Sequence, residues 1–322
     1  MIWIKILLIP VIGILGIIIG LLYSGIDRIL AARMQSRVGP PVIQPFLDIR
    51  KLMIKENIIP ENSIPWLFNL MPVLCLASTI VILLYLPFGF EPLLRGDLIL
   101  ILYLLIIPAL CKVIAGFSSG SNYAWVGAQR EMVMMMSYEF PLAITIISIA
   151  YLFTSEGIAN PFSIQTVISN PCWSITGVSG FLGLVILFLV LLFVMPAELA
   201  VIPFDLPEAS QEIAGGILAE YSGRNLALFY LAGVVKAVVF GSIIIALFFP
   251  HGLNIPGITG ILADLVFFFV KLFLLVFIGS TFIRVAASRL KISQVVYTYW
   301  FVSVLVSLFG LLLIVIDISI FS

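Results

Sequence analysis

The feature that most constrains this chain is a series of eight apolar stretches, each long enough to cross a membrane as a helix. The hydrocarbon core of a bilayer is about 30 Å thick and takes about 20 apolar helical residues to cross. The apolar residues run continuously and do not alternate with polar ones, which favours helices over the strands of a barrel. The predicted spans are 2–24, 66–88, 97–115, 132–153, 177–195, 226–249, 261–283 and 296–320.

The sequence therefore predicts an all-α, polytopic membrane protein with a single integral membrane domain over residues 1–322. Its 62% hydrophobic and 10% charged residues agree with this class, because charged residues make up about a quarter of an ordinary soluble domain. The formal net charge is zero, so no nucleic-acid partner is expected. Only Lys5 precedes the apolar run of the first span and no small-residue cleavage site follows it, so this span is expected to be retained.

The chain offers few ligands for a redox metal. Cys75, Cys111 and Cys172 lie far apart without a C-x-x-C pair, and His251 is the sole histidine. Iron–sulfur clusters and structural zinc need about four such ligands. We therefore expect no metal, no cofactor and no independent catalytic activity in this chain, and we interpret the cysteines as small buried hydrophobic residues.

The distribution of Lys and Arg predicts the orientation. Eleven of them fall in the loops after spans one, three, five and seven, and only Lys5 and Arg95 fall on the other side. The excess of positive charge marks the cytoplasmic side, so both termini are expected outside the cell membrane. Residues 25–65 are then a cytoplasmic loop, and residues 196–225 are an acidic cytoplasmic loop between spans five and six.

The second half of the first cytoplasmic loop mixes basic and apolar residues. The pattern from Phe46 to Lys55 predicts an amphipathic helix that lies on the membrane surface and contacts lipid headgroups. It serves either as an anchor or as a docking surface for a partner. The rigid bend at Gly39-Pro40-Pro41 favours docking, since an anchor would not need it.

Three lysines and one glutamate fall within predicted spans. Lys236 and Lys271 lie about ten residues into their helices, near the midplane, where a lysine costs at least about 3 kcal/mol and usually faces an ion or proton path. Lys112 is close enough to a helix end to extend to the membrane surface, so a structural role is expected for it. Glu139, followed by Pro141, is a candidate proton or cation carrier, and the alternative is a purely structural hydrogen bond to a neighbouring helix.

The acidic loop contains PFDLPEASQEIAGGILAEY, residues 203–221, which holds four carboxylates and no Lys or Arg. Asp205 and Glu208 have the spacing of a capping box and are expected to start a helix. Glu212, Glu220 and the preceding Glu198 are not explained by capping. A row of carboxyls that leads toward buried lysines is what a proton or Na⁺ pathway requires, and Gly215-Gly216 suggests that the segment can bend.

Several motifs resemble one family over nearly the whole chain. They are RMQSRVGPPVIQPFLDIRKLMIKENIIPE, SYE at residues 137–139, AELAVIPFDLPEASQEIAGGILAEYSG and FIRVAASRLKISQ. They are similar to the membrane subunit that joins the two arms of respiratory complex I. The short RVGPP segment before Gln44-Pro45, and GAQREM with Glu131, more closely resemble the counterpart in energy-converting nickel–iron hydrogenases and related membrane-bound respiratory complexes. Ser293 departs from the Asp that this family commonly has before Gln294.

The resemblance implies a non-redox subunit of a larger oxidoreductase. Its expected partners are an iron–sulfur small subunit, a nickel–iron-hydrogenase-like large subunit and antiporter-like membrane subunits, with the iron–sulfur and possible nickel–iron cofactors in those partners. By resemblance, the ion pathway consists of Glu139, Glu198, Asp205, Glu208, Glu212, Glu220, Lys236 and Lys271. The implied docking residues are Arg28, Arg33, Arg37, Arg284 and Arg289.

The leading hypothesis is a membrane anchor that couples electron transport in a peripheral redox module to H⁺ or Na⁺ translocation. One alternative is the quinone chamber of a genuine NADH:quinone oxidoreductase, against which the short RVGPP segment argues. The other is a stand-alone ion transporter, although the two halves show no pairing of broken helices. The sequence leaves open the translocated ion, the electron donor and acceptor, the motion of the acidic loop and the effect of Ser293.

Overall fold

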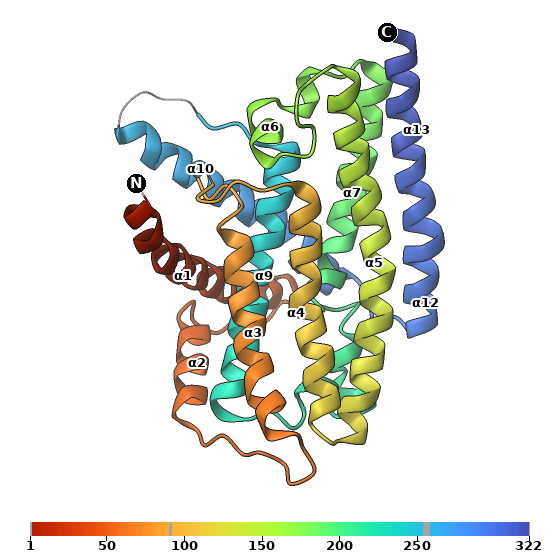
Figure 1. Ribbon diagram of the computed structural model, residues 1–322. Coiled ribbons are helices and arrows are strands. Elements are labelled where there is room, and N and C mark those ends of the chain that lie inside the picture. Colours follow the sequence, from red (N-terminus) through yellow and green to blue (C-terminus); the bar gives the residue numbers. More distant parts are fainter. Residues whose placement is uncertain (1, 90–91, 254–257, 322) are drawn as a thin grey trace.

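The computed structural model describes residues 2–89, 92–253 and 258–321, and the helices dominate these ranges (Figure 1). The long helices are α1 (Ile2–Met34), α3 (Pro65–Leu83), α4 (Leu98–Ser118), α5 (Asn122–Ser155), α7 (Val178–Glu198), α9 (Gly223–Phe248), α10 (Ile258–Val276) and α13 (Val304–Phe321). The short ones are α2 (Gln44–Ile54), α6 (Ile164–Ser169), α8 (Ser210–Ile213), α11 (Ile283–Ala286) and α12 (Ile292–Tyr297). Within the described residues, eight helical runs are long and apolar enough to cross a membrane, which confirms the predicted fold class.

Helix α9 is the centre of the bundle. In the most apolar 18-residue stretch of α9, 83% of the residues are buried. In the corresponding stretch of the helical segment that contains α10, 22% are buried. In Figure 1, α3 lies beside α9 and α4 lies between α3 and α5, while α5, α7 and α13 form a neighbouring layer, in agreement with the contacts between these helices. The helices α1 and α10 run obliquely along the other side (Figure 1).

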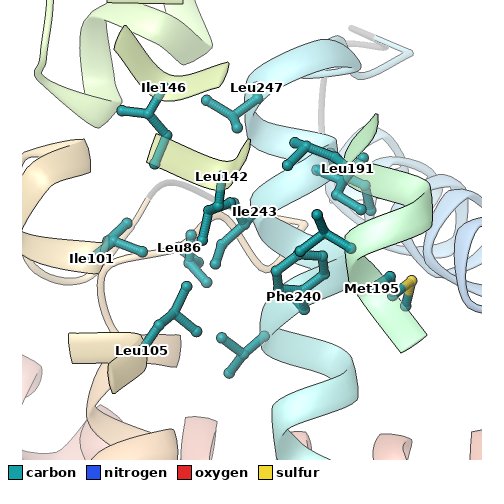
Figure 2. Close-up of a cluster of buried hydrophobic side chains, with 14 of the residues drawn as sticks. Leu86, Ile101, Leu105, Leu142, Ile146, Leu191, Met195, Phe240, Ile243 and Leu247 are labelled. Carbon is teal, nitrogen blue, oxygen red and sulfur yellow. The ribbon is translucent and has the colours of Figure 1, made fainter. Parts of the chain in front are cut away.

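The core is formed where α4, α5, α7 and α9 meet. Figure 2 shows Leu105 of α4, Leu142 of α5, Leu191 of α7 and Phe240 and Ile243 of α9 pointing toward one another. All five side chains are buried. Close packing of these branched and aromatic side chains fixes the helices relative to one another.

Helix α5 is longer than its predicted span. It covers 34 residues, a length of about 50 Å that exceeds the thickness of a bilayer core. The predicted span began at residue 132, whereas the helix begins at Asn122. Arg130 and Glu131 therefore belong to this helix and not to a loop.

Helix α2 occupies the predicted amphipathic segment and packs against α1 and α9. Pro45 stands in its first turn, where the missing N–H of proline is tolerated. Arg50 and Lys51 are exposed. The position of α2 on a membrane surface stays a prediction.

The ion pair between Arg28 of α1 and Asp48 of α2 predicts a small pH response. The hydrogen bond from Arg28 holds the pKa of Asp48 below its usual range. A carboxyl whose pKa is lowered by folding stabilises the fold above its unfolded pKa, and this contribution is lost as the pH falls through the folded value. Hydrogen exchange in α2 should therefore rise modestly below about pH 4, and Asp48→Asn should remove the response. The effect is small because 43% of the Arg28 and 36% of the Asp48 side chain is exposed.

Asp317 joins the C-terminal helix to the start of α7. Its Oδ2 accepts a hydrogen bond of 2.7 Å from the backbone N–H of Gly177, and its Oδ1 accepts one of 2.6 Å from Ser179. Only 4% of Asp317 is exposed. The carboxylate thus serves as a helix cap that is supplied by another helix.

Replacing Asp317 by alanine is expected to lower the stability of the subunit by about 1.5–3 kcal/mol, the value of hydrogen bonds to a charged group. The melting temperature of the purified assembly measures this loss. Ser319→Ala is the matched control, because Ser319 is exposed and bonds to a carbonyl of its own helix. Equal melting temperatures for the two variants would contradict this role of Asp317.

Candidate functional site

The acidic segment between α7 and α9 folds as a chain of short turns against the first part of α5. It contains the 3-10 turns η2 (Leu206–Glu208) and η3 (Gly216–Leu218), with α8 between them. All three contact α5, and η3 also contacts α4. The segment lies at the lower end of the bundle in Figure 1.

Two glycines let the segment pack closely. Gly216 has a φ of 55°, and a Cβ at this position would lie 1.9 Å from the carbonyl oxygen of Pro207. A Cβ at Gly127 of α5 would lie 2.8 Å from the same oxygen. Both glycines supply left-handed backbone in a packed turn, and Gly216 also allows the close contact with Pro207. The capacity of the segment to bend at Gly215-Gly216 stays a prediction.

The predicted capping box is wrong. Neither η2 nor α8 has a side-chain cap. The carboxylate of Asp205 instead accepts two hydrogen bonds from Arg289, one of them 2.7 Å long from Nε to Oδ1. Glu208 accepts one of 2.8 Å from Lys112. A full ion pair with a distant cation stabilises each carboxylate more than a backbone N–H of a one-turn helix would.

The contact with Arg289 ties the acidic segment to the linker between α11 and α12. The backbone N–H of Leu290 also donates to the carbonyl of Pro203, at 3.2 Å. The hydrogen bond to Asp205 raises the pKa of Arg289 above its usual range. The loops after spans five and seven therefore form one connected surface.

Glu198 and Lys236 form the deepest ion pair in the described chain. Glu198 ends α7, Lys236 lies midway along α9, and Oε1 is 2.9 Å from Nζ. Their side chains are 1% and 9% exposed, respectively. Oε1 has no hydrogen bond of good geometry despite this short distance, so the contact is an ion pair without an aligned hydrogen bond.

A third pair lies at the exposed end of the site. Glu212 of α8 and Arg130 of α5 are 2.6 Å apart, with 44% of the Glu212 side chain exposed. The cations that pair with Glu198, Glu208 and Glu212 all lie on long helices of the bundle. The carboxylates are therefore compensated by residues distant in the sequence.

Glu131 and Lys112 belong to this site although neither was assigned to the ion pathway from the sequence. Glu131 is 2% exposed, and its electrostatic neighbours are Lys112, Lys236, Glu208 and Glu198. The ammonium of Lys112 is held by Glu208 of the acidic segment, and its position relative to the membrane surface stays a prediction. The signal that was missed is the true start of α5, which puts Glu131 inside a helix.

Glu139 continues the series of carboxyls formed by Glu208, Glu198 and Glu131, and it lies further along α5. It lies eight residues beyond Glu131 in the sequence, which corresponds to about 12 Å along a helix. It interacts with Glu198 and Lys236, and its Oε1 is enclosed without a hydrogen-bond partner. Glu220 is partly exposed and takes part in none of the ion pairs of the described residues.

The structure places Lys271 apart from these residues. Its Nζ donates hydrogen bonds to the carbonyls of Phe249 and His251, at 2.8 and 2.7 Å, and lies 4.5 Å from the centre of the Phe267 ring. These partners lie in α10 and in the connection between α9 and α10. Because α10 runs obliquely to the other helices (Figure 1), the number of residues between the start of the helix and Lys271 does not give the depth of Lys271 in a membrane.

The five arginines implied as docking residues divide into two groups. Arg28, Arg284 and Arg289 are engaged within the chain by Asp48, Asp27 and Asp205, respectively. Arg33 and Arg37 are exposed and form no ion pair within the described ranges. Of the set, these two are free to meet a partner.

Two neighbouring cavities lie beside the ion pairs. The first, of about 270 Å³, lies between α1, α9, the π-helical turn Phe277–Phe282 and the acidic segment, and Asp27, Lys112, Glu208 and Arg284 line it. The second, of about 400 Å³, lies between α1, α2 and α9. Tyr230 lines both. The acidic segment therefore borders a space that reaches toward α2.

In the described part of the chain, no group of three His, Cys, Asp or Glu side chains could hold a metal ion. The three cysteines are buried and free. The chemistry of the site is thus that of carboxyls and amines in a mostly apolar surrounding. Such groups bind and move protons or small cations.

Comparisons with known proteins agree with the motifs. The profile of the family described as NADH dehydrogenase matches residues 5–315. A subunit of the NADH-quinone oxidoreductase of Brevibacillus brevis is 32% identical over 317 residues, which cover 95% of this chain and 91% of that protein. A chain in the structure of the membrane-bound sulfane sulfur reductase, an archaeal respiratory membrane complex, has a TM-score of 0.85 at 28% identity and covers 96% of this chain and 99% of its own. This chain belongs to the NADH dehydrogenase family and is a membrane subunit of a complex I-like respiratory assembly.

Proposed function

We propose that this subunit couples electron transfer in an attached redox module to translocation of H⁺ or Na⁺. The observation that carries the proposal is the row of carboxyls from the exposed Glu212, through Glu208 and Glu198, to Glu139. Two lysines within the bundle, Lys112 and Lys236, hold members of this row. Buried carboxyl and amine groups are costly in a membrane protein and usually mark an ion or proton path.

The acidic segment connects this row to the surface where a redox partner would dock. Asp205 fixes the segment to the linker that follows α11. A change in charge at the docked module would act first on the exposed pair of Glu212 and Arg130. Lys271 is bound elsewhere in the fold, and its part in the pathway stays a separate prediction.

The partners and orientation belong to the same proposal. An iron–sulfur small subunit and a nickel–iron-hydrogenase-like large subunit would dock on the cytoplasmic loops, with Arg33 and Arg37 as free basic contacts, and would carry the cofactors. Antiporter-like subunits would cover part of the exposed apolar surface. Both termini would face outward from the cell membrane, as the distribution of Lys and Arg predicts.

The proposal is tested with the whole assembly. An affinity tag on this chain should recover subunits with iron–sulfur clusters. Inverted membrane vesicles given the electron donor should then accumulate H⁺ or Na⁺, and loss of this chain should abolish the accumulation. Accumulation that persists without the chain would refute the proposal.

A quinone chamber is the second candidate function. It is favoured by the cavity of about 270 Å³, which two tyrosines, Tyr23 and Tyr230, line together with charged residues. The relative from Brevibacillus brevis is named as a quinone oxidoreductase subunit. Quinone-dependent electron transfer that is blocked by an inhibitor of quinone sites would support this function, and transfer without quinone would exclude it.

A further inference from the structure

Among the described residues, the two carboxyls that α5 contributes to the site, Glu131 and Glu139, have no cation of their own, and Glu131 is the more deeply buried of the two. Around it, Glu208 is paired with Lys112, and Glu198 is paired with Lys236. Oε2 of Glu131 has no hydrogen-bond partner among the residues that the structure describes. Immediately around Glu131, two ammonium groups thus stand beside three carboxyls, so full ionisation would leave at least one excess negative charge in a buried site.

An excess buried charge is not tolerated without compensation. Transfer of an ionised carboxyl into an apolar environment costs many kcal/mol unless it is paired, and such groups usually become neutral instead. Glu131 is 2% exposed, so the surrounding water cannot solvate it. One bound proton removes the excess charge without any movement of the neighbouring helices.

The surroundings of Glu131 favour a proton over a metal cation. The groups that interact with it come from four other elements: Lys112 of α4, Glu208 of η2, Glu198 of α7 and Lys236 of α9, with Cys75 of α3 and Tyr138 of its own helix also close. Two ammonium groups repel Na⁺. A proton that is covalently bound to the carboxyl adds no separate cation to the site.

We infer that Glu131 holds a proton between the two ion pairs and relays it from the Lys112–Glu208 side to the Lys236–Glu198 side. The inference rests on the proposed function and extends it, because it names the proton as the ion carried at this step. The outer pair lies next to the acidic segment and the cavity, and the inner pair leads to Glu139. When Glu131 releases its proton, either lysine can leave its present partner for the new carboxylate.

The relay therefore works by exchange of partners. Transfer of the proton from Glu131 to Glu198 leaves Glu131 ionised and Glu198 neutral, and Lys236 then moves from Glu198 to Glu131. The original pairs are restored when Glu198 passes its proton on toward Glu139 and Glu131 takes up a new proton that enters by the cavity lined by Lys112 and Glu208. The unaligned contact between Glu198 and Lys236 suits such an exchange, since no well-aligned hydrogen bond to Oε1 has to be broken.

Infrared spectroscopy of the purified assembly tests the inference without any measurement of pumping. The spectrum of the unmodified assembly minus that of Glu131→Gln should contain the C=O band of a neutral carboxyl, with a downward shift in D₂O. Glu156→Gln is the matched control at the exposed end of α5, where the same subtraction should give the bands of an ionised carboxylate. Glu131→Asp should move the neutral band without removing it, so this variant carries the test if the Gln variant does not assemble.

Carboxylate bands for Glu131 in place of the neutral band would overturn the inference. So would a neutral band that turns into a carboxylate band when Na⁺ replaces K⁺, since Glu131 would then be a cation site. Redox-driven ion uptake by Glu131→Gln should fall by about 100-fold, a typical value for the loss of a positioned proton carrier. If Glu131→Gln kept full ion uptake while variants of the other acidic residues lost it, the relay would be overturned and the proposed function would stand. If ion uptake needed none of the acidic residues, the proposed function itself would be overturned.

Discussion

Replacing Lys236 by methionine is expected to destabilise the subunit by about 3–5 kcal/mol, the cost of leaving one partner of a buried ion pair without the other. Glu198 is 3% exposed and lies at the junction of α7 and the acidic segment. Methionine has nearly the length of lysine, so the loss comes from the charge and not from packing. The melting temperature and the yield of the assembled complex should both fall.

The double variant Lys236→Met/Glu198→Gln should recover most of this loss, because it leaves no unpaired charge. Arg130→Met is the control at the exposed pair, where an ion pair contributes about 0–1 kcal/mol. A double variant that is as unstable as the single one would show that the pair is not the source of the effect.

Replacing Gly216 by alanine is expected to detach the acidic segment from α5. The new Cβ would lie 1.9 Å from a backbone oxygen, and a backbone atom in a packed turn cannot withdraw as a flexible side chain can. Left-handed backbone adds about 1–2 kcal/mol for any residue with a Cβ. Hydrogen exchange of residues 199–222 should increase strongly, and the pairs made by Glu208 and Glu212 should be lost.

Gly215→Ala separates the two causes. Gly215 has a φ of 98°, but the nearest atom to a new Cβ would be 3.8 Å away. This variant should show only the backbone strain and keep the segment in position. Equal hydrogen exchange in the two variants would mean that close packing against Pro207 does not hold the segment.

The arrangement of spans could be predicted because it depends on the length of apolar runs, which is a local property. Helix ends were less predictable. The polar start of α5, from Asn122 to Glu131, gives no signal of membrane insertion, and it is helical because the acidic segment and α4 pack against it. Tertiary packing of this kind stabilises helices beyond what local sequence indicates.

The ion pairs of the site could not be predicted, since their partners are far apart in the chain. Lys112 and Glu208 are separated by 96 residues, and Arg130 and Glu212 by 82. The sequence showed only that carboxyls gather without local cations. Asp205 and Glu208 match a capping box in spacing, but spacing alone cannot reveal a cation that approaches from another helix.

The acidic segment is held by ion pairs to two other parts of the chain. Arg289 holds it to the last loop, and Lys112 holds it to the bundle. Any displacement of the acidic segment would break or exchange these pairs. Bending at Gly215-Gly216 stays a prediction beside this exchange of ion pairs.

The most direct test of the coupling is the number of ions moved per electron in inverted vesicles that contain Glu139→Gln. Glutamine keeps the shape of Glu139 but can neither release a proton nor bind a cation strongly. We expect electron transfer to continue while the ion-to-electron ratio falls to near zero, and we expect Glu156→Gln to keep the normal ratio. An unchanged ratio in Glu139→Gln would contradict the proposed coupling.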